Sequence, residues 1–317
     1  MITVFTPTYN RAHLLPRLYE SLCQQTCTDF EWLIVDDGST DGTESLIQNF
    51  ELRIKNSAQC GNEATPALSQ QEGEHNCNLP FRGAGGIRYI KQPNGGKHRA
   101  INRGVREAHG ELFFIVDSDD YLLDNSLEIV AAKFEKIKNN HKIGGVCGLD
   151  VAPDQSLVSS GFPQEEIICN CLGIRLKHRV TGDLKEVFRI DVLREFPFPE
   201  IEDERFCPEA LVWNRIAQKY DLLFFNRPIY VAEYQDGGLT DRIVRIRMES
   251  PVATVITYQE LNSYDIPFMQ KVKAAINYWR FRECVPRGKN IPKLPLHWFW
   301  YLPIGMLMHQ RDVRSSR

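Results

Sequence analysis

Three short clusters of polar residues each follow an apolar run and could together bind a phosphorylated ligand. They occupy residues 6–11, 36–42 and 117–120. The third cluster holds Asp117 and Asp119, two carboxylates separated by one residue, and Mg²⁺ or Mn²⁺ shares such hard oxygen ligands with phosphate oxygens. With an aromatic ring in the first cluster and a carboxylate in the second, the set suits a nucleoside diphosphate bound through a divalent cation. Asp-Gly and Asp-Asp pairs are also ordinary turn residues, so the prediction depends on all three clusters occurring in this order.

Two cations in the chain could bind a pyrophosphate. Lys97 and Arg99 follow a Gly-Gly pair at the predicted start of a helix, where free backbone N–H groups and cationic side chains favour phosphate oxygens. Ordinary solvated helix charges are the alternative for both residues. A P-loop is excluded, because Lys91 stands where its first glycine belongs and His98 stands where Ser or Thr belongs.

Strands and helices must bring these clusters together. Runs of apolar and β-branched residues at 2–6, 32–35, 87–90 and 112–116 alternate with helical patterns, which predicts a βαβα order. Strands that are apolar throughout indicate a parallel sheet covered on both faces, and ligands bind beyond the carboxyl ends of such strands. Because the clusters stand at these ends, we expect them to meet along one edge of the sheet.

Helices are predicted between and after these strands. The first is capped by Asn10 and carries leucines at four-residue spacing, and the next two cover residues 97–108 and 126–138. Further along, a helix is expected at 209–219 and a strand at 229–234.

Two segments fall outside this alternation. Residues 55–86 have no hydrophobic period, and their scattered Gly, Asn, Gln, Ser and Glu predict an irregular loop or insertion. The end of the chain is basic and aromatic, so we divide the protein into a domain of residues 1–240 and a helical extension of residues 241–317.

Charge is unevenly distributed along the chain. The formal net charge is −3, whereas residues 268–317 hold ten Lys and Arg against two acidic residues, a local charge of +8. The aromatic residues interleaved with these cations are Tyr278, Trp279, Phe281, Trp298, Phe299, Trp300 and Tyr301. This combination is typical of segments at a membrane interface, so we expect residues 268–317 to contact an anionic membrane surface. Packing of the rings onto the preceding domain is the alternative, and no recognised module indicates nucleic acid as a partner.

Composition and cysteine use predict the cellular compartment. Hydrophobic residues make up 43% of the sequence and charged residues 25%, which is typical of a folded soluble protein. The nine cysteines form no C-x-x-C pair, and Met1 is followed by neither the basic nor the long apolar region of a signal peptide. We therefore expect a cytoplasmic protein with reduced thiols, with a peripheral position on the inner face of the cell membrane as a further expectation.

With these motifs, the sequence resembles the glycosyltransferase family two enzymes of the GT-A fold, of the kind found in bacterial surface polysaccharide biosynthesis. The resemblance covers about residues 1–130: the opening strand, the Asp-Asp-Gly-Ser-Thr-Asp stretch, and the stretches beginning at Asn94 and Val116. It implies an α/β fold with a Rossmann-like, mostly parallel sheet and helices on both faces. The basic, aromatic extension would follow this domain.

The resemblance also implies roles for individual residues. Pro7 and Tyr9 would frame the nucleobase, and Asp37 would accept from it. Asp117 and Asp119 would bind the ribose and the metal, Mn²⁺ or Mg²⁺. The donor would be a nucleotide sugar, most often a UDP-sugar, and transfer would proceed with inversion. The metal and the cations after the Gly-Gly pair would neutralise the leaving nucleotide diphosphate.

An acidic triplet supplies the candidates for the catalytic base. Glu202, Asp203 and Glu204 resemble the family's Glu-Asp element, from which the base comes, and an inverting transfer needs a carboxylate beside the acceptor hydroxyl. Asp203 is our choice, Glu202 and Glu204 stay open, and a solvated acidic turn is the alternative. Asp183 and Asp236 are weaker candidates on the acceptor side. The histidines show no i, i+4 pair, so no third protein ligand for the metal is identified.

The expected function is metal-dependent, inverting transfer of a sugar from a nucleotide sugar to a glycan or lipid-linked acceptor. A sugar nucleotidyltransferase would also use acidic pairs and Mg²⁺, but it would release pyrophosphate. A non-catalytic nucleotide-sugar binding protein at the membrane would bind the donor without turnover. The sugar, the acceptor and the linkage depend on loop shapes that residue spacing does not define.

Overall fold

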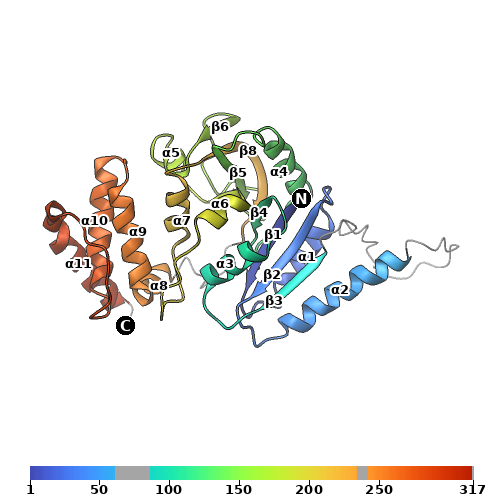
Figure 1. The fold of residues 1–317 in the computed structure, drawn as a ribbon, viewed down its shortest axis with the longest axis horizontal. Coiled ribbons are helices and arrows are strands. Elements are labelled where there is room, and N and C mark those ends of the chain that lie inside the picture. The colour runs from blue at the N-terminus through green and yellow to red at the C-terminus, as the bar shows by residue number, and fades with distance from the viewer. Residues whose placement is uncertain (61–85, 234–241, 316–317) are drawn as a thin grey trace.

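The computed structural model describes residues 1–60, 86–233 and 242–315. In the order in which they lie across the sheet, the strands are β3 (Ile87–Lys91), β2 (Phe30–Asp36), β1 (Ile2–Thr8), β4 (Leu112–Ile115), β7 (Leu184–Arg189), β5 (Ile143–Val151), β8 (Asp221–Val231) and β6 (Glu166–Cys169) (Figure 1). The sheet is parallel from β3 to β4, and β7 runs antiparallel between β4 and β5. Beyond it, β8 is parallel to β5 and β6 is antiparallel to β8. This mostly parallel sheet confirms the predicted α/β fold class.

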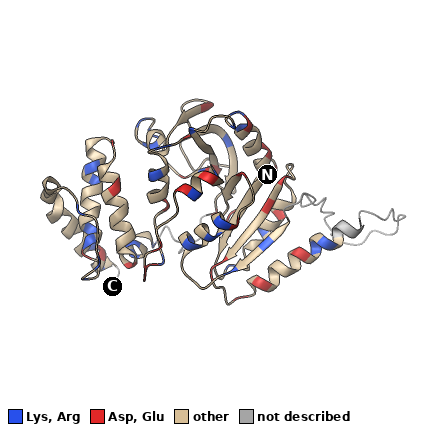
Figure 2. Cartoon of the chain, viewed as in Figure 1, with Lys and Arg blue, Asp and Glu red and all other residues tan. Residues whose placement is uncertain are grey.

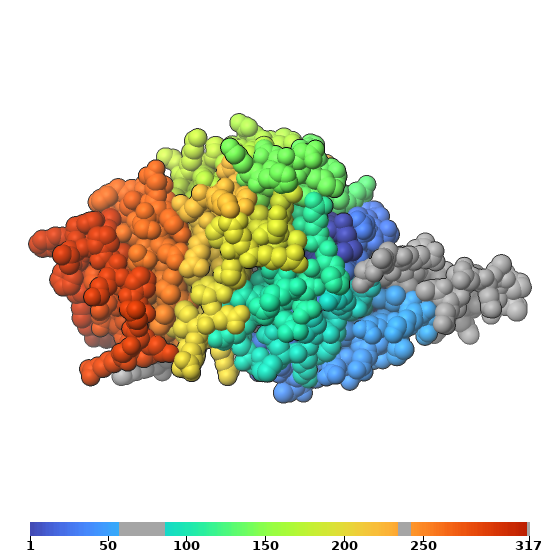
Figure 3. Space-filling model, in the orientation of Figure 1, coloured from blue at the N-terminus to red at the C-terminus, as the bar shows by residue number. Residues whose placement is uncertain are grey.

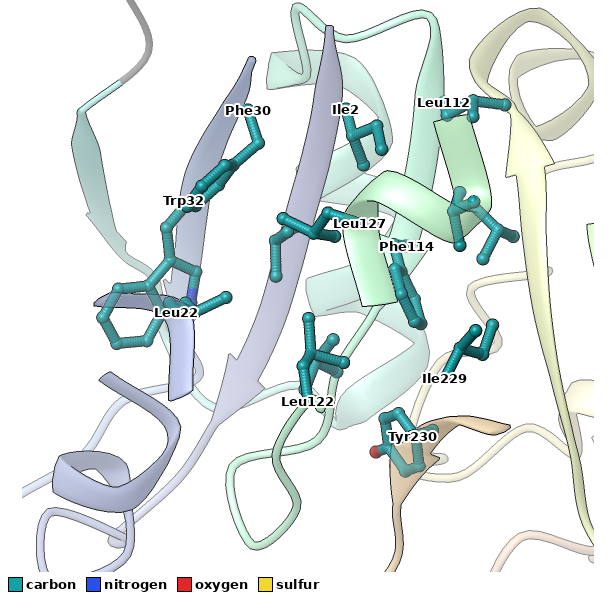
Figure 4. Close-up of a cluster of buried hydrophobic side chains, with 14 of the residues drawn as sticks. Ile2, Leu22, Phe30, Trp32, Leu112, Phe114, Leu122, Leu127, Ile229 and Tyr230 are labelled. Carbon is teal, nitrogen blue, oxygen red and sulfur yellow. The ribbon is translucent and has the colours of Figure 1, made fainter. Parts of the chain in front are cut away.

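Helices cover both faces of the sheet and continue beyond it. In chain order they are α1 (Leu15–Cys23), α2 (Thr43–Cys60), α3 (Lys97–Glu107), α4 (Ser126–Glu135), α5 (Cys171–Leu176), α6 (Ile190–Glu195), α7 (Glu209–Ile216), α8 (Ile243–Glu249), α9 (Pro251–Ser263), α10 (Phe268–Arg282) and α11 (Leu302–Ser315), with the 3₁₀ turn η2 (Leu296–Tyr301) before the last. On one face, α1, α2 and α4 pack against alternate residues of β1, β2 and β4 (Figure 4). The intervening residues of these strands meet α3, α6 and α7 on the other face, as the two-residue period of a strand requires. Both faces are therefore buried, which explains strands that are apolar throughout.

The C-terminal helices have a hydrophobic cluster of their own. They form one end of the molecule, next to the segment that contains α7 (Figure 3). Tyr278 and Trp298 are buried in this cluster, and Gly305 lets α11 approach α10, since a Cβ there would lie 2.5 Å from Trp279 Cβ. Arg280 of α10 holds Asp312 of α11 with hydrogen bonds of 2.5 and 2.8 Å. The predicted helical extension is thus a packed unit.

The predicted division between the two parts stays a prediction. It falls at residues 240 and 241, which lie outside the described residues, as do 234–241 as a whole. Lys and Arg side chains are carried by α10 as well as by α3 (Figure 2). No helix in the described part of the chain is both long and apolar enough to cross a membrane.

Several predicted boundaries were wrong. The first helix begins at Leu15 and is not capped by Asn10, because Asn10 takes a left-handed conformation with φ 53° and accepts a 2.8 Å hydrogen bond from the Thr40 N–H. Residues 55–60 were assigned to the irregular segment 55–86 but continue α2, and 61–85 lie outside the described residues. Strand β8 ends near the predicted strand but begins at Asp221, eight residues earlier than expected.

Candidate active site

An open cavity of about 890 Å³ lies at the edge of the sheet where β1, β4 and β5 end. Because β7 runs antiparallel to its neighbours, its first residues stand at this edge as well. The residues assigned to the donor and the metal from sequence that line the cavity are Pro7, Tyr9, Asp37, Lys97, Asp117 and Asp119. The three polar clusters therefore meet along one edge, as the strand pattern predicts. Their individual roles remain proposals.

Lys97 stands between two carboxylates in this cavity. Its Nζ lies 2.7 Å from Asp117 Oδ1 and 2.9 Å from Glu209 Oε1. Burial by itself would lower the pKa of Lys97, but the charges of Asp117 and Glu209 raise it well above its usual value. Burial raises the pKa of Asp117, and the charges of Lys97 and Lys185 outweigh this and lower it. The cavity therefore holds a permanent cation beside a permanent anion.

The other acids of the third cluster have different partners. Asp119 accepts a 2.5 Å hydrogen bond from the Arg11 guanidinium. Asp120 accepts a 2.5 Å hydrogen bond from the Tyr230 hydroxyl and one of 2.9 Å from the Glu233 N–H. Burial and the charge of Asp117 raise the pKa of Asp120 to about 6. Asp120 is thus tied to the end of β8, whereas Asp119 is held by a surface cation that a phosphate could also attract.

Asp37 organises the turn that precedes α3. Its carboxylate accepts from the Gly95 N–H at 2.9 Å, the Gly96 N–H at 2.7 Å and the Gln92 side chain at 2.8 Å. Gly96 has φ +97°, and a Cβ there would lie 1.9 Å from the Arg205 carbonyl oxygen, so only glycine fits this turn. Asp37 therefore fixes the start of α3, and hence Lys97. To bind a nucleobase as predicted, the Asp37 carboxylate would have to accept one more hydrogen bond in addition to these three.

Arg99 does not line the cavity, and its expected donor-binding role stays a prediction. Its guanidinium donates to the carbonyl oxygens of Gly95 at 2.8 Å, Glu204 at 2.9 Å and Ile201 at 2.6 Å. The contacts with Ile201 and Glu204 fix the loop that follows α6, and the contact with Gly95 lies in the turn before α3. Arg99 thus lies in the first turn of α3 with Lys97, but on the opposite side of the helix, where it has a positioning role.

The structure places none of the three acids of the triplet at the cavity, and the expectation that one of them is the catalytic base stays a prediction. Glu204 is 5% exposed and accepts from the Val252 N–H at 2.6 Å and the Ala253 N–H at 2.9 Å, in the first turn of α9. The side chain of Asp203 is 83% exposed and lies 3.7 Å from Lys289 Nζ. Glu202 is exposed too, and in the described chain none of the three lines the cavity. The triplet faces the C-terminal helices because its loop is fixed by the contacts of Arg99 and Glu204.

Glu209 is the acid that the sequence reading missed. It is the first residue of α7, follows Pro208 and lines the cavity. An acidic residue in the first turn of a helix is readily explained by the helix dipole alone, so its spacing carried no separate signal. Its place soon after the triplet, behind Pro208, was the available hint.

Three further acids line the side of the cavity formed by β5 and β7. They are Asp150, Asp183 and Glu186. Burial raises the pKa of Asp150 to about 7 and that of Glu186 to about 7. Asp150 is 4% exposed, and its Oδ1 has no hydrogen-bond partner among the described residues. Asp183 was a weak candidate from sequence and does stand at the cavity, whereas Asp236 lies outside the described residues.

The fit of a divalent cation can be judged from the donor atoms. No group of three His, Cys, Asp or Glu side chains able to hold a metal occurs in residues 1–60, 86–233 and 242–315. Asp117 and Asp119 nevertheless both line the cavity, and Mg²⁺ or Mn²⁺ commonly uses one or two carboxylates and completes its shell with substrate phosphates and water. The residues therefore fit a cation that is shared with a bound diphosphate.

Comparison with known proteins supports the predicted resemblance. Residues 3–59 and 77–153 match the family described as Glycosyl transferase family 2. The match lies within the first half of the chain, and the resemblance predicted from sequence is confirmed there. The chondroitin synthase of Pasteurella multocida is 28% identical over 162 residues, which is 51% of this chain but only 14% of that protein. The GalNAc(5)-diNAcBac-PP-undecaprenol beta-1,3-glucosyltransferase of Campylobacter jejuni is 27% identical over 67% of this chain and 58% of its own length. The chain thus spans less than two thirds of the length of these relatives.

Solved structures agree on the fold. TarS 1–349 of Staphylococcus aureus, in complex with UDP-GlcNAc, aligns over 100% of this chain and 92% of its own with a TM-score of 0.57 and 15% identity. The mannosyltransferase PcManGT of Pyrobaculum calidifontis, in complex with GDP-Man and Mn²⁺, aligns over 99% and 75% with a TM-score of 0.53 and 17% identity. At these identities the likeness extends to the GT-A type fold and not to the substrates.

Proposed function

We propose that this protein transfers a sugar from a nucleotide sugar, most often a UDP-sugar, to a hydroxyl of a glycan or lipid-linked acceptor, with inversion. The arrangement that carries the proposal is the Lys97 ammonium between Asp117 and Glu209 in one cavity. Such a transfer needs a cation and a carboxylate on the donor side. It also needs a second carboxylate that faces them.

The donor would lie along the β1 and β4 side of the cavity. Tyr9 is half exposed there and could stack on a nucleobase beside Pro7. Asp117 and Asp119 would hold the divalent cation, which supplies positive charge to the pyrophosphate oxygens when bound. Lys97 adds a charge that persists at every physiological pH because its pKa is raised. Arg11, on the same wall, could exchange its contact with Asp119 for a phosphate oxygen.

The acceptor would be activated by Glu209. In the proposed step the acceptor oxygen bonds to the anomeric carbon while the bond from that carbon to the phosphate oxygen breaks. The bonding electron pair leaves with the nucleoside diphosphate, and the acceptor proton passes to the Glu209 carboxylate. Attack from the face opposite the leaving group gives inversion. Glu209 suits this role because it lines the same cavity as Asp117 while lying across Lys97 from it.

A screen of nucleotide sugars tests the proposal. With Mn²⁺ and each UDP-sugar or GDP-sugar in turn, release of nucleoside diphosphate should be seen for one donor class and should fall strongly in Lys97→Met. Lys91→Met is the matched control, because that exposed lysine pairs with Glu44 at the surface and does not line the cavity. Formation of pyrophosphate from UTP and a sugar phosphate would instead identify a nucleotidyltransferase. Tight donor binding without release under all conditions would indicate a binding protein.

We further propose that the enzyme works at an anionic membrane surface reached through residues 268–317, on the cytoplasmic side. The support is the local charge of +8 and the exposure of Phe299 and Trp300, although Tyr278, Phe281 and Trp298 of the same aromatic set are buried. The exposed rings are therefore available to a membrane, whereas the buried rings pack within the protein. The name of the Campylobacter jejuni relative, which includes a PP-undecaprenol, supports a lipid-linked acceptor.

A further inference from the structure

A second open cavity, of about 740 Å³, lies in the C-terminal helices. We name it the C-terminal groove. Its walls come from the end of α9, the start of α10 and the segment around the start of η2. The side chains that matter for its chemistry are Lys271, Lys293, His297, Phe268, Leu294 and Trp298. The groove therefore combines cations with apolar and aromatic surface.

The cations of this groove have no acidic partners. Neither Lys271 nor Lys293 forms an ion pair with any residue in the described ranges, and no described Asp or Glu lines the groove. Other cations of the same region do have partners, since Arg280 is paired with Asp312 and Arg215 with Glu260. Two lysines that face a groove without counter-charge form a place for an anion.

The walls of the groove are fixed by partly buried hydrogen bonds. The Asn262 side chain donates to the Lys271 carbonyl at 2.9 Å, which ties the start of α10 to α9. The Trp279 ring N–H donates to the Trp298 carbonyl at 3.0 Å, and the Tyr278 hydroxyl donates to the Pro292 carbonyl at 2.9 Å. The groove is thus formed before any ligand binds, which lowers the entropic cost of binding.

Exposed apolar side chains occur in η2 and α11, and Leu296 stands between the groove residues Pro295 and His297 in the sequence. We name Leu296, Trp300 and Leu307 the apolar ridge. Within η2, Trp298 is 5% exposed and anchors the turn, whereas Leu296 is 90% and Trp300 85% exposed. Ile304 and Leu307 of α11 are also exposed. Large apolar side chains gathered beside cations are the arrangement of segments that insert at a membrane interface.

We propose that the C-terminal groove binds the phosphate of an anionic lipid headgroup while the ridge of Leu296, Trp300 and Leu307 enters the interface. Lys271 and Lys293 would contact the phosphate oxygens. This inference rests on the membrane contact proposed above and names the site that makes it, and it does not depend on the transfer reaction. A headgroup fits better than a free phosphate ion because Lys293 of the groove and the exposed Leu296 belong to one short segment, and only a lipid offers a phosphate and an apolar surface at once.

Co-sedimentation with vesicles tests the site. Full-length protein should bind phosphatidylcholine vesicles that contain phosphatidylglycerol and should stay in the supernatant with phosphatidylcholine alone. The double variant Lys271→Ala/Lys293→Ala should lower the partition coefficient about 30-fold, since each basic residue at an anionic surface contributes about fivefold. Lys142→Ala/Lys177→Ala removes the same charge from exposed lysines of the sheet domain and should change partitioning less than about twofold. Leu296→Ser/Trp300→Ser should weaken binding without changing its dependence on phosphatidylglycerol.

The outcomes separate the groove from the wider proposals. Circular dichroism and the thermal midpoint show whether each variant remains folded. Equal losses in the two lysine pairs would mean that only net charge attracts the membrane, which overturns the groove while leaving membrane contact. Displacement by inorganic phosphate beyond that by chloride at equal ionic strength would support a phosphate site in the groove, whereas phosphate binding without vesicle binding would overturn the lipid assignment. A stable dimer of the wild type that Leu296→Ser/Trp300→Ser dissociates, with no vesicle binding, would make the ridge an interface between copies. Release of nucleoside diphosphate in the donor screen is independent of all these results.

Discussion

Lys97 and Glu209 approach within 2.9 Å across the cavity, one from the start of α3 and the other from the start of α7. Because Asp117 contacts the same ammonium at 2.7 Å, Lys97 links the carboxylates of Asp117 and Glu209. On the proposed function, the oxygens of a pyrophosphate compete with both for this cation. Donor binding would therefore weaken the hold of Lys97 on Glu209 and leave that carboxylate free to accept a proton.

The first prediction concerns the base. Glu209→Gln should leave the affinity for UDP within about threefold of wild type and lower turnover by about 10²-fold to 10⁴-fold, the usual contribution of a general base. The measurements are calorimetric binding of UDP with Mn²⁺ and the rate of UDP release from the donor found in the screen. Asp203→Asn is the control, because Asp203 is exposed and does not line the cavity. A large loss in Asp203→Asn with none in Glu209→Gln would return the role to the triplet.

The second prediction concerns the metal. UDP should bind at least about tenfold more weakly in EDTA than with Mn²⁺, because Asp117 and Asp119 would otherwise repel the pyrophosphate. Asp119→Ala should bind UDP equally with and without Mn²⁺. Calorimetric titration of wild type and of Asp119→Ala with UDP, in Mn²⁺ and in EDTA, measures this. Arg11→Gln is the control, because it removes the cationic partner of Asp119 but keeps the carboxylate. Wild-type binding that is equally tight in EDTA would remove the metal role from Asp119.

How far the sequence predicts this structure depends on which contacts fix each element. The strands β1 to β4 and the helix α3 were predicted within a few residues. For β1, β2 and β4 the reason is that strands buried on both faces read as continuous apolar runs, whereas β3 is a partly buried edge strand. Strand β5 was not recognised, since Gly144, Gly145 and Gly148 dilute its apolar pattern. Its place beside β7 and β8 is set by pairing with segments that follow it much later in the chain.

The candidate site shows the same limit. The donor-side residues follow strand ends directly, so sheet topology alone brings Pro7, Asp37 and Asp117 together. The acidic triplet belongs to a loop whose direction depends on Arg99 and on the backbone of α9, both distant in sequence. Matching the family's Glu-Asp element therefore located the right region of the chain but not the side chain that faces the cavity.

The third prediction concerns this loop. Glu204→Ala should lower the free energy of unfolding by about 1–3 kcal/mol, because the Val252 and Ala253 N–H groups would lose their acceptor in a buried place. UDP affinity should stay unchanged. Urea denaturation measures the effect, with Glu202→Ala as the exposed control that should change stability by less than about 0.5 kcal/mol. Equal stability of the two variants would show that Glu204 does not hold α9 to the loop.

The fourth prediction concerns the pH dependence of stability. Burial, opposed by the charge of Lys185, raises the pKa of Asp150 to about 7, so the folded protein keeps a proton that the unfolded chain loses near pH 4. This contribution to stability is complete below about pH 4 and is lost progressively as the pH rises from there through 7. Between pH 5 and pH 8 its loss should lower the free energy of unfolding by about 2.5 kcal/mol, and Asp150→Asn should remove that part of the slope, because the amide stays neutral at both values. Urea denaturation of both proteins at the two pH values isolates Asp150 from other titrating groups.

Asp154→Asn is the control: its exposed carboxylate has a pKa lowered by hydrogen bonds from Ser156, so replacing it should not flatten the slope. Wild-type and Asp150→Asn curves that fall in parallel would mean that Asp150 is ionised in the folded state, stabilised by the nearby ammonium of Lys185.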